Sequence, residues 1–222
     1  SDDEKGDLIF KTNDGSDGAS PTERLRIDSA GSIIPATLGN DNVHLGESAL
    51  ASVASGAGQN TGIGANAGTS ITTGDYNTLL GYNAGDALTT GSSNVAVGYN
   101  ALSAEDGDGS NIAIGANALG NQNAGATAYN VAVGHDAGAS VTTGIYNTLI
   151  GGLSGDALTD GSYNVGVGYS LTADTRGSKS VGVGSHTLIN QNFTSATDAH
   201  NTAVGYQAGK EVTTGQYNTA IG

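Results

Sequence analysis

A five-residue motif, Asn-x-x-aliphatic-Gly, recurs along most of the 222-residue chain. Chains with short tandem repeats build one small unit per repeat and bury its apolar side by stacking it on its neighbours. The intervals run from 16 to 21 residues and are most often 17, which predicts an all-β, parallel β-solenoid or β-roll of about eleven coils. The copies begin at Asn42, Asn60, Asn77, Asn94, Asn111, Asn130, Asn147, Asn164, Ser180, Asn201 and Asn218.

The three residues after each Asn alternate in character, as in Val95-Ala96-Val97, and a period of two indicates a strand. We expect the two flanking aliphatic residues to face a core that the stacked strands share. The middle residue is mostly small, so we expect a neighbouring chain to approach the opposite face.

The conserved spacing of Asn and Gly predicts the corners of the coil. Glycine accepts a positive φ, and Asn tolerates left-handed geometry and can form a hydrogen-bonded ladder. We expect two short strands and two turns per coil, the second strand lying in segments such as 82–85, and a rod about 50 Å long. The structural repeat residues are Asn77, Gly81, Asn94, Gly98, Asn111, Gly115, Asn130, Gly134, Asn147 and Gly151.

A longer period overlies the coil. The segment that begins at Val141 recurs at Val212 and is matched at Ile71, with spacings of 70 and 71 residues, so four coils form a higher unit. The triplets 121–123 and 190–192 mark the longer loops of successive units.

Residues 1–35 lack the repeat and predict a separate N-terminal β adaptor or cap, with strands near 7–12 and 23–28. Residues 36–222 form the predicted solenoid domain, and because its last repeat stops at Gly222 we expect a C-terminally truncated fragment.

The charge narrows the class of partner. The formal net charge is −14, and no Lys or Arg lies between Arg26 and Arg176. This disfavours nucleic acid and anionic lipid as partners. No apolar run reaches the length of a membrane span, and without cysteine there is no thiolate metal site. An acidic surface of this kind favours an extracellular location.

Two stretches resemble known families. Units such as 94–98 and 111–115 resemble the head repeats of YadA-like trimeric autotransporter adhesins, and this resemblance covers residues 42–222. It implies a left-handed homotrimeric roll. The segments 6–10 and 23–31 resemble a stretch common in phage tail fibres and related virion proteins, where it precedes such repeats. Together they favour a phage fibre over a bacterial adhesin.

One acidic turn resembles the start of a calcium loop, with Asp106, Asp108 and Ser110 at alternate positions. The match then fails, because Asn111 stands where the loop needs glycine and Asn117 where it needs glutamate. A solvated acidic turn is the favoured interpretation, and weak calcium binding is the alternative.

The nine tyrosines all lie just before the repeat Asn or just after its Gly. This regularity favours stacked aromatic columns, with a glycan-binding surface as the alternative. The histidines lack zinc spacing, although His44 of three chains could meet on a trimer axis. Columns at Thr72, Thr142 and Thr213 raise ice binding, but they recur only once per four coils.

We therefore expect no enzyme and no cofactor. The leading hypothesis is a homotrimeric structural fibre segment on a virion surface, a rigid spacer that contributes to host attachment through a cell-surface glycan or protein. The alternatives are a bacterial trimeric adhesin head and, less favoured, an ice-binding solenoid.

Overall fold

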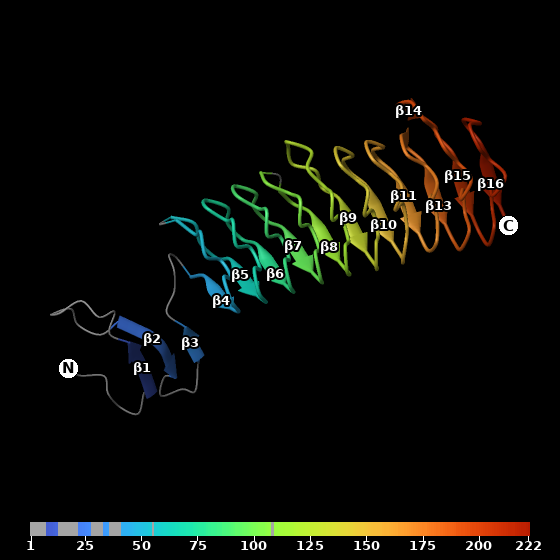
Figure 1. Ribbon diagram of the computed structural model, residues 1–222. Coiled ribbons are helices and arrows are strands. Elements are labelled where there is room, and N and C mark those ends of the chain that lie inside the picture. The colour runs from blue at the N-terminus through green and yellow to red at the C-terminus, as the bar shows by residue number, and fades with distance from the viewer. Residues whose placement is uncertain (1–7, 13–21, 28–32, 36–40, 55, 108) are drawn as a thin grey trace.

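The protein is an all-β solenoid. The computed structural model describes residues 8–12, 22–27, 33–35, 41–54, 56–107 and 109–222, and these contain no helix. Figure 1 shows the coils stacked along a rod with their strands side by side. The eleven strands of this parallel sheet are β4 (Val43–Leu45), β5 (Thr61–Ile63), β6 (Thr78–Leu80), β7 (Val95–Val97), β8 (Ile112–Ile114), β9 (Val131–Val133), β10 (Thr148–Ile150), β11 (Val165–Val167), β13 (Val181–Val183), β15 (Thr202–Val204) and β16 (Thr219–Ile221).

The register of the sheet is constant. Val95, Ala96 and Val97 of β7 pair with Ile112, Ala113 and Ile114 of β8, and the same pairing holds across the longer coil between β8 and β9. Extra residues are therefore absorbed in the loops. The predicted fold class is confirmed, with about ten complete coils of mostly 17 residues between the eleven strands.

The expected orientation of the strands is wrong. The middle residues of the strands point into the coil: Leu79, Ala96 and Ala113 are fully buried. The flanking aliphatic residues point outward, and Ile112 and Ile114 are 37% and 38% exposed. Most middle residues are small because the interior of the coil is narrow, with Leu79 and Leu149 as large exceptions, and a neighbouring chain plays no part in their burial.

The expected second strand of each coil is also wrong. Segments such as 82–85 are turns, in which Asn83 has a φ of 53° and Gly85 a φ of 58°. Backbone hydrogen bonds still join these turns from coil to coil, as from Gly85 N–H to the Ala101 carbonyl at 3.0 Å. On this side the described residues show an isolated bridge between Ser170 and Thr187, and one short strand pair, β12 (Gly177–Ser178) with β14 (Thr197–Asp198), lies in the segment before the repeat Asn.

Two kinds of coil alternate in how they fill the interior. Glycine coils have Gly at the fourth residue after the repeat Gly and an aliphatic residue three places later, as in Gly85 and Leu88. A β-carbon at Gly85 would lie 2.8 Å from side-chain atoms of both Leu79 and Leu88. Leucine coils have Leu at that fourth position instead, at Leu50, Leu102, Leu119 and Leu188, and the shorter coil after Gly168 has Leu171 at the third position, all with positive φ.

Three N-terminal strands form a separate antiparallel sheet. β1 (Leu8–Thr12) pairs with β2 (Thr22–Ile27), which pairs with β3 (Ile33–Pro35). The two predicted strands are present, and the third was not predicted. The role of residues 1–35 as an adaptor or cap stays a prediction.

Candidate functional site

The repeat asparagines form a buried ladder inside the rod. Each side-chain Oδ1 accepts a hydrogen bond from the backbone N–H of the next repeat Asn, as from Asn94 to Asn77 and from Asn147 to Asn130, at 2.9 and 2.8 Å. In most coils the Nδ2 donates to a glycine carbonyl, as from Asn77 to Gly91 at 2.9 Å. Asn42 instead donates to the Ala57 carbonyl, and Asn111 Nδ2 has no partner among the described residues. A buried amide without such partners would cost about 1–3 kcal/mol. The ladder therefore explains why Asn begins ten of the eleven repeats.

The repeat glycines form the corner that follows each strand. Gly98 has a φ of 138°, and a β-carbon there would lie 2.5 Å from the carbonyl oxygen of Gly115 in the next coil. Both the backbone geometry and the close approach of the coils exclude a side chain. The same holds at the other four predicted positions, Gly81, Gly115, Gly134 and Gly151, and also at Gly64.

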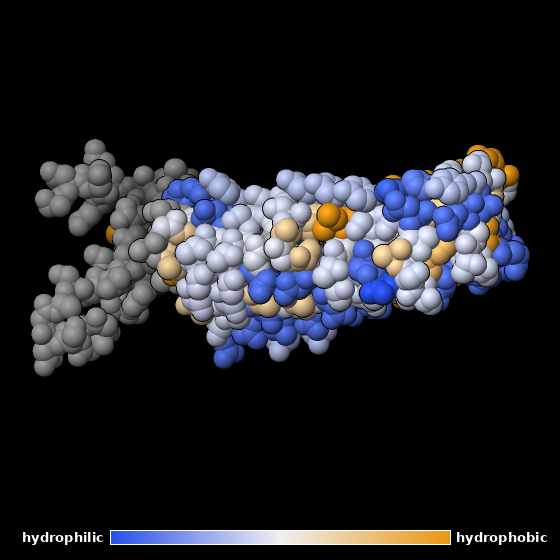
Figure 2. Space-filling model, turned by 90° about the horizontal axis from the view of Figure 1, so that it is seen from above, coloured by the Kyte–Doolittle hydropathy of each residue, from blue (hydrophilic) through white to orange (hydrophobic). Residues whose placement is uncertain are grey.

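The outward strand residues form one apolar strip, which we call the aliphatic face. It contains the first and third residues of each strand in the parallel sheet, and most of these are Val, Ile or Leu. Exposure reaches 46% at Leu80 and 40% at Ile150 in the middle of the rod. By contrast, the side of the rod seen in Figure 2 is mostly hydrophilic or neutral, with apolar residues in small separate groups.

Tyrosine columns border the aliphatic face, as the sequence predicted. Tyr129, Tyr146 and Tyr163 stack with ring centroids 5.2 and 5.1 Å apart on the side before the repeat Asn. Tyr82 and Tyr99 stack at 5.7 Å on the side after the repeat Gly. All nine tyrosines are between 37% and 74% exposed, so the stacked columns remain available to a partner.

The threonine columns are hydrogen-bonded within the rod. The hydroxyls of Thr72 and Thr142 donate to the carbonyls of Thr89 and Thr159 in the next coil, at 3.1 and 3.2 Å. Their donor is therefore used by the protein and not by an ordered water layer. These hydrogen bonds therefore disfavour ice binding through the threonine columns.

The calcium candidate lies only partly within the described residues. Asp106 is exposed, Ser110 is half-buried, and Asp108 lies outside the part of the chain that the structure describes. The Asp106 backbone carbonyl accepts hydrogen bonds from Thr89. Among the described residues no group of three or more His, Asp or Glu side chains could hold a metal ion.

Four buried polar residues were missed by the sequence analysis. Glu105, Gln122, Asp174 and Gln191 are fully buried in leucine coils, at the position that Leu88 takes in a glycine coil. Gln191 donates to Asp174 Oδ2 and to Ser180 Oγ, and its Oε1 accepts from Asn201 at 2.7 Å. Their coil position, aligned with Ile71 and Leu88, is the signal that could have revealed them.

His44 lies in the inward column of β4. It pairs with Gly62, in the column of Leu79 and Ala96, whereas Val43 and Leu45 point outward. His44 is half-buried and does not project from the aliphatic face, and its meeting with the same residue of other chains on a trimer axis stays a prediction.

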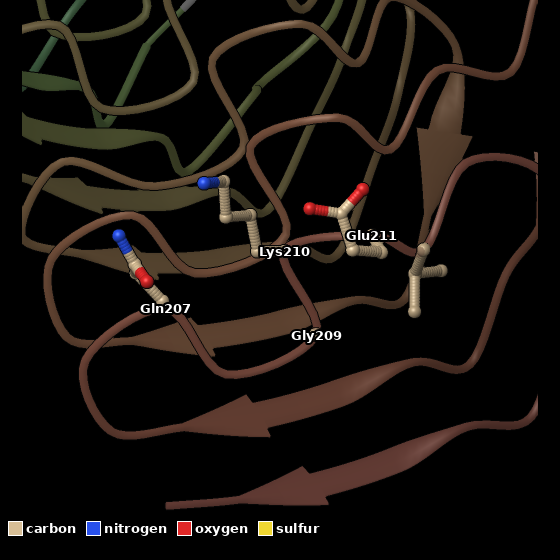
Figure 3. Close-up of a pocket in the computed structure, with 5 residues that line it drawn as sticks. Gln207, Gly209, Lys210 and Glu211 are labelled. Atoms are coloured by element: carbon tan, nitrogen blue, oxygen red, sulfur yellow. The ribbon is translucent and has the colours of Figure 1, made fainter.

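Two depressions lie on the part of the surface that the described residues form. One is formed by Gln207, Gly209, Lys210, Glu211 and Val212 in the last complete turn, and Figure 3 shows Lys210 and Glu211 projecting from that turn. The other, which we call the polar groove, spans three successive coils and encloses about 310 Å³. Its lining residues are Asn100, Ser103, Asn117, Gly120, Asn121, Asp136 and Ala139.

Comparison with protein-family models, curated proteins and solved structures finds no match for this chain. Within the described residues, no helix is long and apolar enough to cross a membrane.

Proposed function

We propose that this chain is a segment of a homotrimeric fibre on the outside of a phage or phage-like particle, where it acts as a rigid spacer that contributes to host attachment. The observation that carries the proposal is the aliphatic face. A continuous apolar strip on a soluble protein is the usual mark of an interface.

The period of the aliphatic face favours a second copy of this chain as its partner. Each of the eleven strands contributes Val, Ile or Leu to this face, and neighbouring strands are about 4.8 Å apart. A partner that buries the whole strip must repeat with the same spacing over the same length. Copies of the same solenoid, aligned in parallel, meet that condition without further adjustment.

The two tyrosine columns favour a cyclic arrangement. One edge of the aliphatic face contains Tyr129, Tyr146 and Tyr163, and the other contains Tyr82 and Tyr99. Because the two edges differ, the first edge of one copy would meet the second edge of the next, which is a heterologous contact that closes into a ring. Three copies, rather than another number, is what the resemblance to YadA-like heads supports.

The bonding between coils supports a spacer role. Each coil is bonded to the next through the sheet, the turns and the asparagine ladder, so the rod has no internal hinge among residues 56–107 and 109–222. The choice of a virion over a bacterial adhesin head rests on the resemblance of residues 6–10 and 23–31 to tail-fibre segments. Antibody labelling of intact particles and of intact cells separates these two.

Light scattering tests the assembly. Wild-type protein should have three times the 21.8 kDa chain mass, about 65 kDa. Ile114→Asp, which puts a charge on the aliphatic face, should yield a folded 21.8 kDa monomer. The matched control Asn121→Asp changes an exposed residue away from that face and should stay trimeric. A wild-type monomer contradicts the proposal.

A further inference from the structure

The polar groove lies beside an interrupted aromatic column. The residues that follow the repeat Gly in successive coils are Tyr82, Tyr99, Ala116 and His135. Tyr82 stacks on one face of Tyr99. On the other side Ala116 leaves a gap between Tyr99 and His135, which are two coils, or about 10 Å, apart along the rod.

The next four-coil unit shows that such a gap accepts a ring. Tyr169 and Tyr206 stand in the places of Tyr99 and His135, one unit later. His186 lies between them, with its ring centroid 5.0 Å from that of Tyr169 and 5.9 Å from that of Tyr206. The residue in the place of His186 in the first unit is Asn117, whose side chain instead donates to Asp136 Oδ1 at 2.8 Å. One unit therefore fills the ring position itself, and the other leaves it open.

The floor of the groove offers hydrogen bonds. Asn117 and Asn121 use their amide nitrogens on Asp136 and on the Ala139 carbonyl, at 2.8 Å each, so their side-chain oxygens can accept from a ligand. His135 Nδ1 lies 2.9 Å from Asp136 Oδ2 and holds that carboxylate at the groove. Amide and carboxylate oxygens beside an aromatic rim are suited to a ring with several hydroxyl groups.

The charge of the groove restricts the ligand. Asp136 is the one charged residue among those that line it, and no Lys or Arg occurs between Arg26 and Arg176. A sulfated or carboxylated sugar would face repulsion without a compensating cation. A volume of about 310 Å³ lies at the small end of the roughly 300–1,000 Å³ of ligand clefts.

We propose that the polar groove, with Tyr99 and His135 at its rim, binds one uncharged pyranose ring of a cell-surface glycan. The ring would lie over Ala116 between the two aromatic side chains, and its hydroxyls would donate to Asn117, Asn121 and Asp136. This inference rests on the proposed function, because it specifies the chemistry through which a host-attachment fibre would contact its host.

Saturation-transfer NMR with lactose, chitobiose and maltotriose tests it, and sialyllactose serves as the anionic probe. Wild-type protein should transfer saturation to at least one uncharged sugar. Asn117→His should weaken that binding by about tenfold or more, because histidine would take the ring position as His186 does. Folding should persist, since His186 adopts a φ of 62° and Asn117 a φ of 56°.

The second unit supplies the reciprocal variant. His186→Asn empties the ring position between Tyr169 and Tyr206, and should add a second site for the same sugar. Asn83→His is the matched control, with the same substitution at the same coil position but outside the groove, and should bind as wild type does.

The outcomes separate this inference from the proposed function. No transfer to any of the three uncharged sugars would refute sugar binding in the groove. Equal binding by wild type and Asn117→His, or tighter binding of sialyllactose than of the uncharged sugars, would also refute it. Light scattering on the same samples reports the trimer independently. A monomer that binds sugar would support the groove proposal and refute the trimeric fibre. A trimer that binds no sugar would support the fibre and refute the groove proposal.

Discussion

The glycine coils and the leucine coils follow one backbone path with two different interiors. At the same corner Gly85 has a φ of 58° and Leu102 a φ of 53°. In the glycine coil Leu88 then enters the interior, whereas in the leucine coil the equivalent residue is the buried Glu105. Each coil thus places a large aliphatic side chain at the corner or three residues later, beside any Leu in the middle of its strand such as Leu79. The position three residues later accepts a polar residue in coils whose corner residue already supplies the aliphatic side chain.

The largest expected effect comes from removing the aliphatic side chain at or after the corner. Leu88→Ala should lower the free energy of unfolding by about 2–5 kcal/mol, because it creates a cavity beside a glycine that cannot fill it. Leu102→Ala should cost less, since Glu105 remains in the same coil and can draw water into the space. Urea unfolding compares the two, and a greater loss for Leu102→Ala would contradict the comparison.

A second prediction converts one kind of coil into the other. Gly85→Leu alone should cost about 1–3 kcal/mol, because its side chain would overlap Leu79 and Leu88. Adding Leu88→Gln should recover part of that loss, since the pair then matches Leu119 and Gln122. A double-mutant cycle measures the coupling, and additive losses would show that the two positions do not compensate one another.

The two buried glutamines, Gln191 and Gln122, should contribute different amounts to the stability of the fold. Gln191→Leu removes hydrogen bonds to Asp174, Ser180 and Asn201, and should cost about 1–3 kcal/mol. Gln122→Leu should cost less, because Gln122 accepts one bond from Asn130 and its Nε2 has no partner among the described residues. Thermal unfolding of both variants checks the order, and equal losses would contradict it.

The smallest effect concerns two carboxylates in glycine coils. Burial raises the pKa of Asp86 and Asp156 above the usual 3.8, although backbone N–H groups partly offset this. A raised folded pKa gives stability that is present below 3.8 and lost as the pH rises through the folded value. Asp86→Asn and Asp156→Asn should therefore raise the melting temperature slightly at about pH 7, and the gain should vanish near pH 3. A gain that grows in acid would contradict this assignment.

The sequence was sufficient to predict the solenoid because the interval between repeats is the length of one coil. Asn94 recurs because each coil needs its ladder hydrogen bond, and Gly98 recurs because each coil needs its corner. The tyrosine columns follow from the same spacing. The direction of the strand was not predictable in this way, because Val95-Ala96-Val97 alternates equally well in either orientation. Only the narrow width of the coil, which no single repeat reveals, decides that Ala96 is inside.

The polar groove could not be predicted for a related reason. Asn100, Asn117 and Asp136 are 17 and 19 residues apart, and only the stacking of three coils brings them together. The gap at Ala116 becomes visible only beside the filled position of His186. Such sites depend on the comparison of units and not on a local motif.

The absence of cysteine permits the most direct test of the central claim, that the aliphatic face is buried against aligned copies of this chain. Ile114→Cys places a single thiol on that face, and Asn121→Cys places one on a different side of the rod. If parallel copies meet in register, mild oxidation should join Ile114→Cys chains into disulfide-linked dimers and leave Asn121→Cys chains separate. Cross-linking of neither variant, or of Asn121→Cys alone, would contradict the account.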